Sequence, residues 1–113
     1  MGAQAISVLV VSQAAPDRRN LSTELARAGL TVTDADSADD ALRLFDELRP
    51  SALCIHHPAS GAFDGLQVAR RIRARDAIVP IILASERTSE ELILRVLRAG
   101  ANDFLPWPPL LQE

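Results

Sequence analysis

The sequence predicts an α/β fold, built as a doubly wound parallel sheet of five strands with helices on both faces. Two observations carry this prediction. Short apolar segments alternate five times along the chain with segments in which apolar residues recur at helical spacing. The connections are short, and strict alternation of this kind is typical of parallel strands joined by covering helices.

The first third of the chain predicts a strand, a helix and a second strand. Ile6–Val11 is a continuous, mostly β-branched run, as expected for a strand that is covered on both faces. Pro16 is a favoured first helical residue, and the helical spacing of apolar residues continues to Ala28. Gly29 ends that helix, and Leu30–Thr33 predicts the second strand.

The middle of the chain repeats the pattern. Ser37 and Asp40 have the spacing of a capping box and predict the start of a second helix, which Pro50 ends. Ala52–His56 predicts the third strand. The residues that we expect the second helix to bury are Ala41, Leu44, Phe45 and Leu48.

A third helix, a fourth strand and a fourth helix follow. The third helix begins near Leu66, and Ile81–Ala84 predicts the fourth strand. Thr88 and Glu91 form a capping box for a fourth helix that ends at Ala99. The inward residues of the third helix are predicted to be Val68, Ala69 and Ile72.

The end of the chain leaves the sheet without its last cover. Asn102–Leu105 predicts the fifth strand, and the Pro-rich run 106–109 then breaks the chain before the last four residues. Such a short remainder is too small to form a stable covering helix. We therefore expect residues 1–113 to form a single domain that lacks its last helix and is a piece of a longer multidomain protein.

Composition excludes several functional classes. The chain has 113 residues, of which 48% are hydrophobic and 24% charged, with a net charge of −3 and a single cysteine. An acidic balance argues against nucleic-acid binding, and one cysteine cannot form an internal disulfide, which favours a reducing compartment. No apolar run approaches the roughly 20 residues of a membrane span. We expect a cytoplasmic protein.

Three motifs carry a resemblance to a known family. They are Val8-Leu9-Val10-Val11 near the start, Asp64-Gly65 after the third strand, and the run Gly100–Leu105. Together with the order of elements they resemble the receiver domain of bacterial response regulators. That resemblance implies the flavodoxin-like fold of the chemotaxis regulator CheY and a role in two-component signal transduction.

The sequence departs from the family at the residues that bind Mg²⁺ and phosphate. The two acids that hold Mg²⁺ after the first strand are replaced by Ser12 and Gln13. The phosphate-accepting aspartate at the end of the third strand falls on His56 when counted from Pro50. Counting back from Asp64-Gly65 gives His57 instead, and we favour His56.

The other family positions are kept only in part. Trp107 stands where the family has a lysine before a proline. Ser85 keeps the hydroxyl of the fourth strand, and Phe104 keeps the aromatic position of the fifth strand. Because Mg²⁺ requires oxygen ligands, usually carboxylates, and phosphoryl transfer requires the metal, we expect no Mg²⁺, no cofactor and no aspartyl phosphate.

These departures predict a degenerate receiver, a pseudo-receiver that is not an enzyme and acts through protein contacts on an attached or partner output domain. Two alternatives remain open. The domain accepts phosphate on a histidine, or it binds a small molecule in the vacated pocket with Trp107 as a hydrophobic wall.

No other chemistry fits the residues. Cys54 and His56 share one face of the third strand and His57 is adjacent, but a structural zinc needs about four ligands and the chain holds no further His or Cys. No Gly-rich phosphate loop follows the first strand, no Asp-x-His-x-x-Gly cobalamin loop is present, and no Gly-x-Ser-x-Gly turn occurs. We predict no metal site.

The fourth helix carries more apolar residues than a sheet can cover. Leu92, Ile93 and Leu94 sweep out a wide arc, so we expect surface around Leu92 and Val96 to stay uncovered. With Trp107 they predict an interface with a protein partner or a second copy, on the fourth helix and fifth strand. The third helix carries a basic cluster that we interpret as a solvated face: Arg70, Arg71, Arg73 and Arg75.

Overall fold

A computed structural model describes residues 6–58, 63–86 and 89–107. Their elements are β1 (Ser7–Val11), α1 (Ala15–Arg27), β2 (Thr31–Ala35), α2 (Ala38–Leu48), β3 (Ala52–His56), α3 (Gly65–Arg75), β4 (Ile81–Ser85), α4 (Glu90–Arg98) and β5 (Asp103–Pro106). No helix within these ranges is long and apolar enough to cross a membrane.

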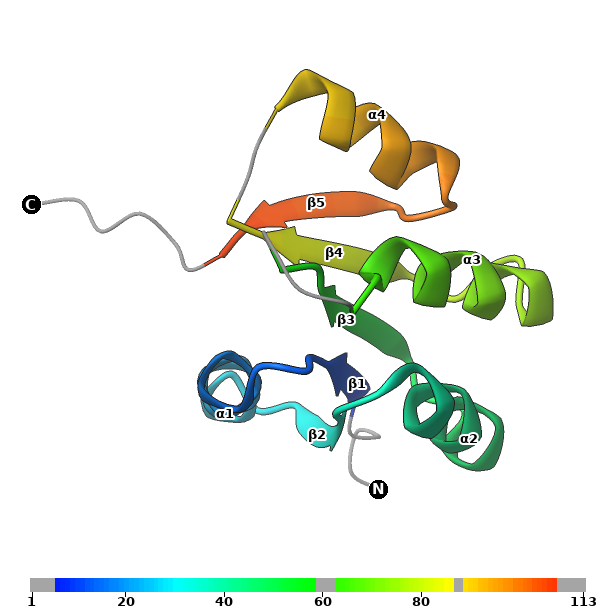
Figure 1. Ribbon diagram of the computed structural model, residues 1–113. Helices are drawn as coiled ribbons and strands as arrows, with labels where there is room; N and C mark the ends of the chain where they lie inside the picture. The colour runs from blue at the N-terminus through cyan, green and yellow to red at the C-terminus, as the bar shows by residue number, and fades with distance from the viewer. Residues whose placement is uncertain (1–5, 59–62, 87–88, 108–113) are drawn as a thin grey trace, which may run out of the picture.

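The five strands form one parallel sheet in the order β2-β1-β3-β4-β5. Figure 1 shows α1 on one face of the sheet and α2 and α3 on the other. Residues of α4 belong to the same buried cluster as those of α2 and α3, so α4 shares their face. The predicted doubly wound fold is confirmed, and in the part of the chain that the structure describes no helix follows β5.

Each face of the sheet has its own core. The larger cluster lies beneath α2, α3 and α4, with Phe45 and Ile72 fully buried in it. The smaller cluster lies on the α1 side. The prediction for α2 was partly wrong, because Leu42 is buried in place of Leu48, which is exposed. The buried side of α3 is as predicted.

Two serines begin helices on the second face. The Ser37 hydroxyl accepts a hydrogen bond from the Asp40 amide at 3.1 Å, which confirms the predicted start of α2. The start of α4 was misplaced by one residue. Its capping residue is Ser89, whose hydroxyl accepts from the Leu92 amide at 3.2 Å, whereas Thr88 lies outside the described residues.

Arg73 ties α3 to the starts of β4 and β5. Its guanidinium donates to the carbonyl of Gly100 twice, at 2.7 and 2.9 Å, and to the carbonyl of Val79 at 2.8 Å. It also donates to Asn102 Oδ1 at 2.9 Å, and that oxygen accepts from the Ile81 amide at 2.8 Å. Arg73 is therefore a structural residue and not part of a solvated basic face.

Replacing Arg73 with lysine keeps the charge but removes the planar fork that reaches several carbonyls at once. Because hydrogen bonds to charged groups contribute about 1.5–3 kcal/mol each, we expect Arg73→Lys to lower the free energy of unfolding by about 2 kcal/mol or more, measured by urea denaturation. Arg70→Lys is the control, since Arg70 is exposed on the same helix and should change stability by less than about 0.5 kcal/mol. Equal effects would contradict the role of Arg73.

Candidate functional site

The carboxyl ends of β1 and β3 meet at a buried Ser12–His56 pair. Ser12 is fully buried and His56 is 1% exposed. Their Oγ and Nδ1 atoms lie 3.2 Å apart, and the Ser12 hydroxyl also lies within hydrogen-bond distance of the Ala14 carbonyl. His56 is therefore enclosed in the sheet edge and does not open on any surface.

His57, one residue later, points to the other side and is held by the start of α3. Its Nδ1 accepts a hydrogen bond from the Gly65 amide at 3.1 Å. A Cβ at position 65 would lie 3.2 Å from the His57 Cβ and 3.0 Å from Ile55, so this close approach favours glycine. Asp64 caps the helix by accepting from the amides of Leu66 and Gln67. The Asp64-Gly65 motif thus anchors His57.

The hydrogen bond from Gly65 sets the protonation of the ring. An Nδ1 that accepts from an amide carries no proton, so a neutral His57 has its proton on Nε2. The pKa of His57 is lowered from its usual 6.5, chiefly because burial penalises the charged ring, with Arg95 and His56 adding to the effect. The Asp64 carboxylate, 3.8 Å from Nδ1, opposes this shift without forming an ion pair to the neutral ring.

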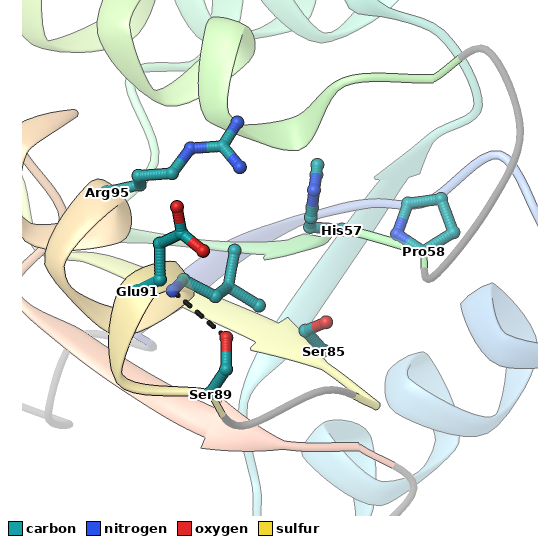
Figure 2. Close-up of a pocket in the computed structure, with 7 residues that line it drawn as sticks. His57, Pro58, Ser85, Ser89, Glu91 and Arg95 are labelled. Atoms are coloured by element: carbon teal, nitrogen blue, oxygen red, sulfur yellow. Dashed lines mark hydrogen bonds between the residues drawn. The ribbon is translucent and has the colours of Figure 1, made fainter.

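His57 lines a polar pocket of about 240 Å³ between the end of β3, the end of β4 and the start of α4 (Figure 2). Figure 2 shows the Arg95 side chain extending past Glu91 toward His57. The full lining is His57, Pro58, Ser85, Ser89, Glu91, Leu92 and Arg95.

Glu91 and Arg95 were not predicted as pocket residues from the sequence. A usable signal was present: both lie on the helix that follows β4, four residues apart, and therefore on one face. The preference for His56 over His57 is not supported, because it is His57 that reaches this pocket while His56 is buried beside Ser12.

Of the remaining predicted site residues, Ser85 lines the same pocket as His57, and the others lie elsewhere. Gln13 lines a separate pocket of about 280 Å³ that also contains Asp64 and Arg71. Ser85 is buried at the end of β4, and Phe104 is half-buried against the larger core. The predicted residues are therefore divided among several places, with His57 and Ser85 together in one pocket and Gln13 and Trp107 in two others.

Trp107 does not form a wall of the polar pocket, which corrects that expectation. It is 8% exposed and packs in the smaller core on the α1 side of the sheet. There it lines a nearly apolar cavity of about 350 Å³ together with Cys54. Burial raises the pKa of the Cys54 thiol to about 11.

The exposed side of α4 is not the one expected. Leu92 and Val96 are buried against the sheet, and the uncovered leucines are Leu94 and Leu97, at 52% and 50% exposure. Ile93 lies at the boundary between the two sides. The apolar residues predicted for an interface are therefore correct only in part, because the helix turns a different face to the sheet.

Two further features concern a possible metal site and the basic cluster on α3. In residues 6–58, 63–86 and 89–107, no three His, Cys, Asp or Glu side chains gather as a metal site would need. The basic cluster on α3 also divides, because Arg75 pairs with Asp46 at 3.2 Å and Arg73 is held by backbone carbonyls.

The lowered pKa of His57 predicts a pH dependence of stability. The unfolded chain binds a proton at His57 at a higher pH than the folded chain does, so stability is complete above about pH 6.5 and falls as the pH drops below it. We expect His57→Gln to lose part of this decrease, measured as the difference in melting temperature between pH 8 and pH 5.5. An unchanged difference in the variant would contradict the assignment.

The chain is similar to known proteins of one family. A family model described as the response regulator receiver domain matches residues 8–110. The chain is 34% identical over 102 residues to the transcriptional regulatory protein AfsQ1 of Streptomyces coelicolor, covering 90% of this chain and 44% of that protein. It is 33% identical over 108 residues to the response regulator MprA of Mycobacterium ulcerans, covering 96% and 46%. The chain thus spans about half the length of these curated relatives.

Solved structures agree with this relationship. The chemotaxis protein CheY4 of Vibrio cholerae matches with a TM-score of 0.84 at 23% identity, covering 95% of this chain and 90% of that one. A response regulator receiver protein from Pseudomonas putida matches with a TM-score of 0.78 at 32% identity, covering 95% and 89%. By sequence and by fold, the chain belongs to the response regulator receiver domain family.

Proposed function

We propose that this receiver domain is a pseudo-receiver, which signals through protein contacts without phosphorylation of an aspartate. One observation carries the proposal: the side chain that opens on the pocket at the end of β3 is His57, an imidazole where the family chemistry requires a carboxylate. The full-length protein would then couple this module to an output domain.

The surroundings of His57 support the loss of metal-dependent phosphorylation. Ser12 is buried and hydrogen-bonded to His56, and Gln13 lines a different pocket. Neither supplies a carboxylate, which is the ligand that Mg²⁺ ordinarily takes from proteins. These two positions therefore lack the ligands that would hold the divalent cation on which phosphoryl transfer depends.

The protonation of His57 also disfavours the alternative in which a histidine accepts the phosphate. Attack on phosphorus needs a free lone pair on a ring nitrogen. The lone pair of Nδ1 is taken by the Gly65 amide, and Nε2 carries the proton of the neutral ring. Arg95 does supply a cation that the sequence did not reveal, but the nucleophile itself is not available in this arrangement.

The proposed contact surface is the uncovered side of α4, formed by Ile93, Leu94 and Leu97. The two leucines are about half exposed on one helix, and contiguous apolar surface of this kind marks interaction sites. Leu105 on β5 is also exposed, at 41%. We propose that a second copy of the domain, or a protein partner, covers this surface.

In the alternative in which the domain binds a small apolar molecule, the binding site is not the pocket beside His57. The cavity beside Trp107 is lined almost entirely by apolar atoms, whereas the pocket beside His57 is polar. An apolar ligand would therefore bind on the α1 side of the sheet and not at the site that the family uses for phosphate.

The absence of phosphorylation is testable by intact mass after incubation with a small acyl phosphate and Mg²⁺. We expect no added phosphoryl group, because the pocket lacks both the acceptor carboxylate and the metal ligands. A receiver domain that carries the acceptor aspartate serves as the positive control. Stoichiometric phosphorylation that is lost in His57→Asn would overturn the proposal.

The contact surface is testable by substituting its exposed leucines. We expect Leu94→Glu and Leu97→Glu to weaken self-association, measured by sedimentation of the protein over a range of concentrations. Leu48→Glu is the matched control, because Leu48 is equally exposed but lies on α2. A wild-type protein that stays monomeric, or a control that behaves like the two variants, would contradict a homodimer through α4.

A further inference from the structure

We propose that the pocket beside His57 binds a small oxyanion, a carboxylate or a phosphate group, held by Arg95 and by the Nε2 proton of His57. This inference rests on the proposed function, since it assigns a reversible ligand to the position where the family forms a covalent phosphate. It changes the role of the pocket from a reaction site to a recognition site.

His57 is fixed as a hydrogen-bond donor toward the pocket. Its Nδ1 is occupied by the Gly65 amide at 3.1 Å, which leaves Nε2–H as the polar group that is free to bind a ligand. The ring cannot turn to offer Nδ1 without giving up that bond. A donor held in place in this way binds an acceptor with little loss of conformational freedom.

Arg95 provides the positive charge. Among the described residues its guanidinium makes no hydrogen bond and no ion pair, even with Glu91 one turn earlier on α4. Figure 2 shows its guanidinium extended toward His57 across the pocket. A guanidinium matches the two oxygens of a carboxylate or a phosphate, and this recognition is stronger than that between neutral groups.

The size and the remaining lining suit a small ligand. The pocket volume of about 240 Å³ lies below the roughly 300–1,000 Å³ of sites for drug-sized molecules. The Ser89 hydroxyl oxygen accepts from the Leu92 amide, so its own proton remains able to donate to a ligand. Three donor types therefore line one cavity: His57 just after β3, Ser89 at the cap of α4, and Arg95 within α4.

Among the described residues that line the pocket, Glu91 is the one whose charge opposes an anion. Its carboxylate lies in the same lining as Arg95 and repels a negatively charged ligand. This arrangement gives the proposal opposite predictions for two neighbouring residues of one helix. Removing the charge of Arg95 should weaken binding, and removing the charge of Glu91 should strengthen it.

The test is a titration with inorganic phosphate and, separately, with acetate, in Mg²⁺-free buffer at constant ionic strength. The readout is the ¹⁵N resonances of the His57 ring, together with the melting temperature. We expect a saturable shift of Nε2 with at least one anion, and none with acetamide, which has the size of acetate without its charge. The anion that binds more tightly identifies the ligand as a carboxylate or a phosphate group.

Three variants complete the test. We expect Arg95→Gln to raise the Kd about tenfold or more, as the loss of a charge-assisted bond implies. Glu91→Gln should lower the Kd severalfold, and Arg98→Gln, an exposed arginine of the same helix outside the pocket lining, should leave it unchanged. No saturable shift with either anion, or equal binding by Arg95→Gln and wild type, would overturn the inference.

The result of this anion titration can be distinguished from the result of the phosphorylation test of the proposed function. Reversible binding is measured by the His57 resonances without Mg²⁺, and covalent phosphorylation by intact mass with Mg²⁺ and an acyl phosphate. Absence of binding with an unchanged mass refutes only the oxyanion site. A stable increase in mass refutes the pseudo-receiver, whatever the anions do.

Discussion

The hydrogen bond from the Gly65 amide to His57 Nδ1 is the contact on which the site depends. It joins the end of β3 to the first residue of α3, and the lack of a Cβ at position 65 allows the two backbones to approach this closely. The same bond fixes the tautomer of the ring. One contact therefore sets the position of the helix, the direction of the side chain and its chemical character as a donor.

Two adjacent histidines have different roles because side chains alternate along a strand. His56 faces the side of the sheet that α1 covers and is enclosed with Ser12, whereas His57 faces α3 and α4 and lines an open pocket that Arg95 also lines. A shift of one residue exchanges a packed interior group for a surface group. The side chain exposed at this edge of the sheet is therefore set by the register of β3, which pairs with β1 on one side and β4 on the other.

The sequence predicted the fold well and the site poorly, for physical reasons. Runs such as Val8–Val11 and the spacing of Val68, Ala69 and Ile72 depend on local periodicity, which survives folding. On α4, apolar residues occur at three successive positions, so periodicity could not determine which of them face the sheet. Tertiary packing chose Leu92 and Val96. The spacing of Glu91 and Arg95 places them on one helix face, but it could not place that face beside His57, which lies far away in the chain.

The place of Cys54 has a consequence for the oxidation chemistry of the protein. It is the sole thiol of the chain, it lines an apolar cavity together with Trp107, and burial keeps it protonated. Oxidants attack the thiolate, so we expect the thiol of the folded domain to resist oxidation by air even when no reductant is present. A disulfide between two chains through this sulfur then requires the α1 side of the sheet to open first. The rate at which such disulfides form therefore measures how often that side opens.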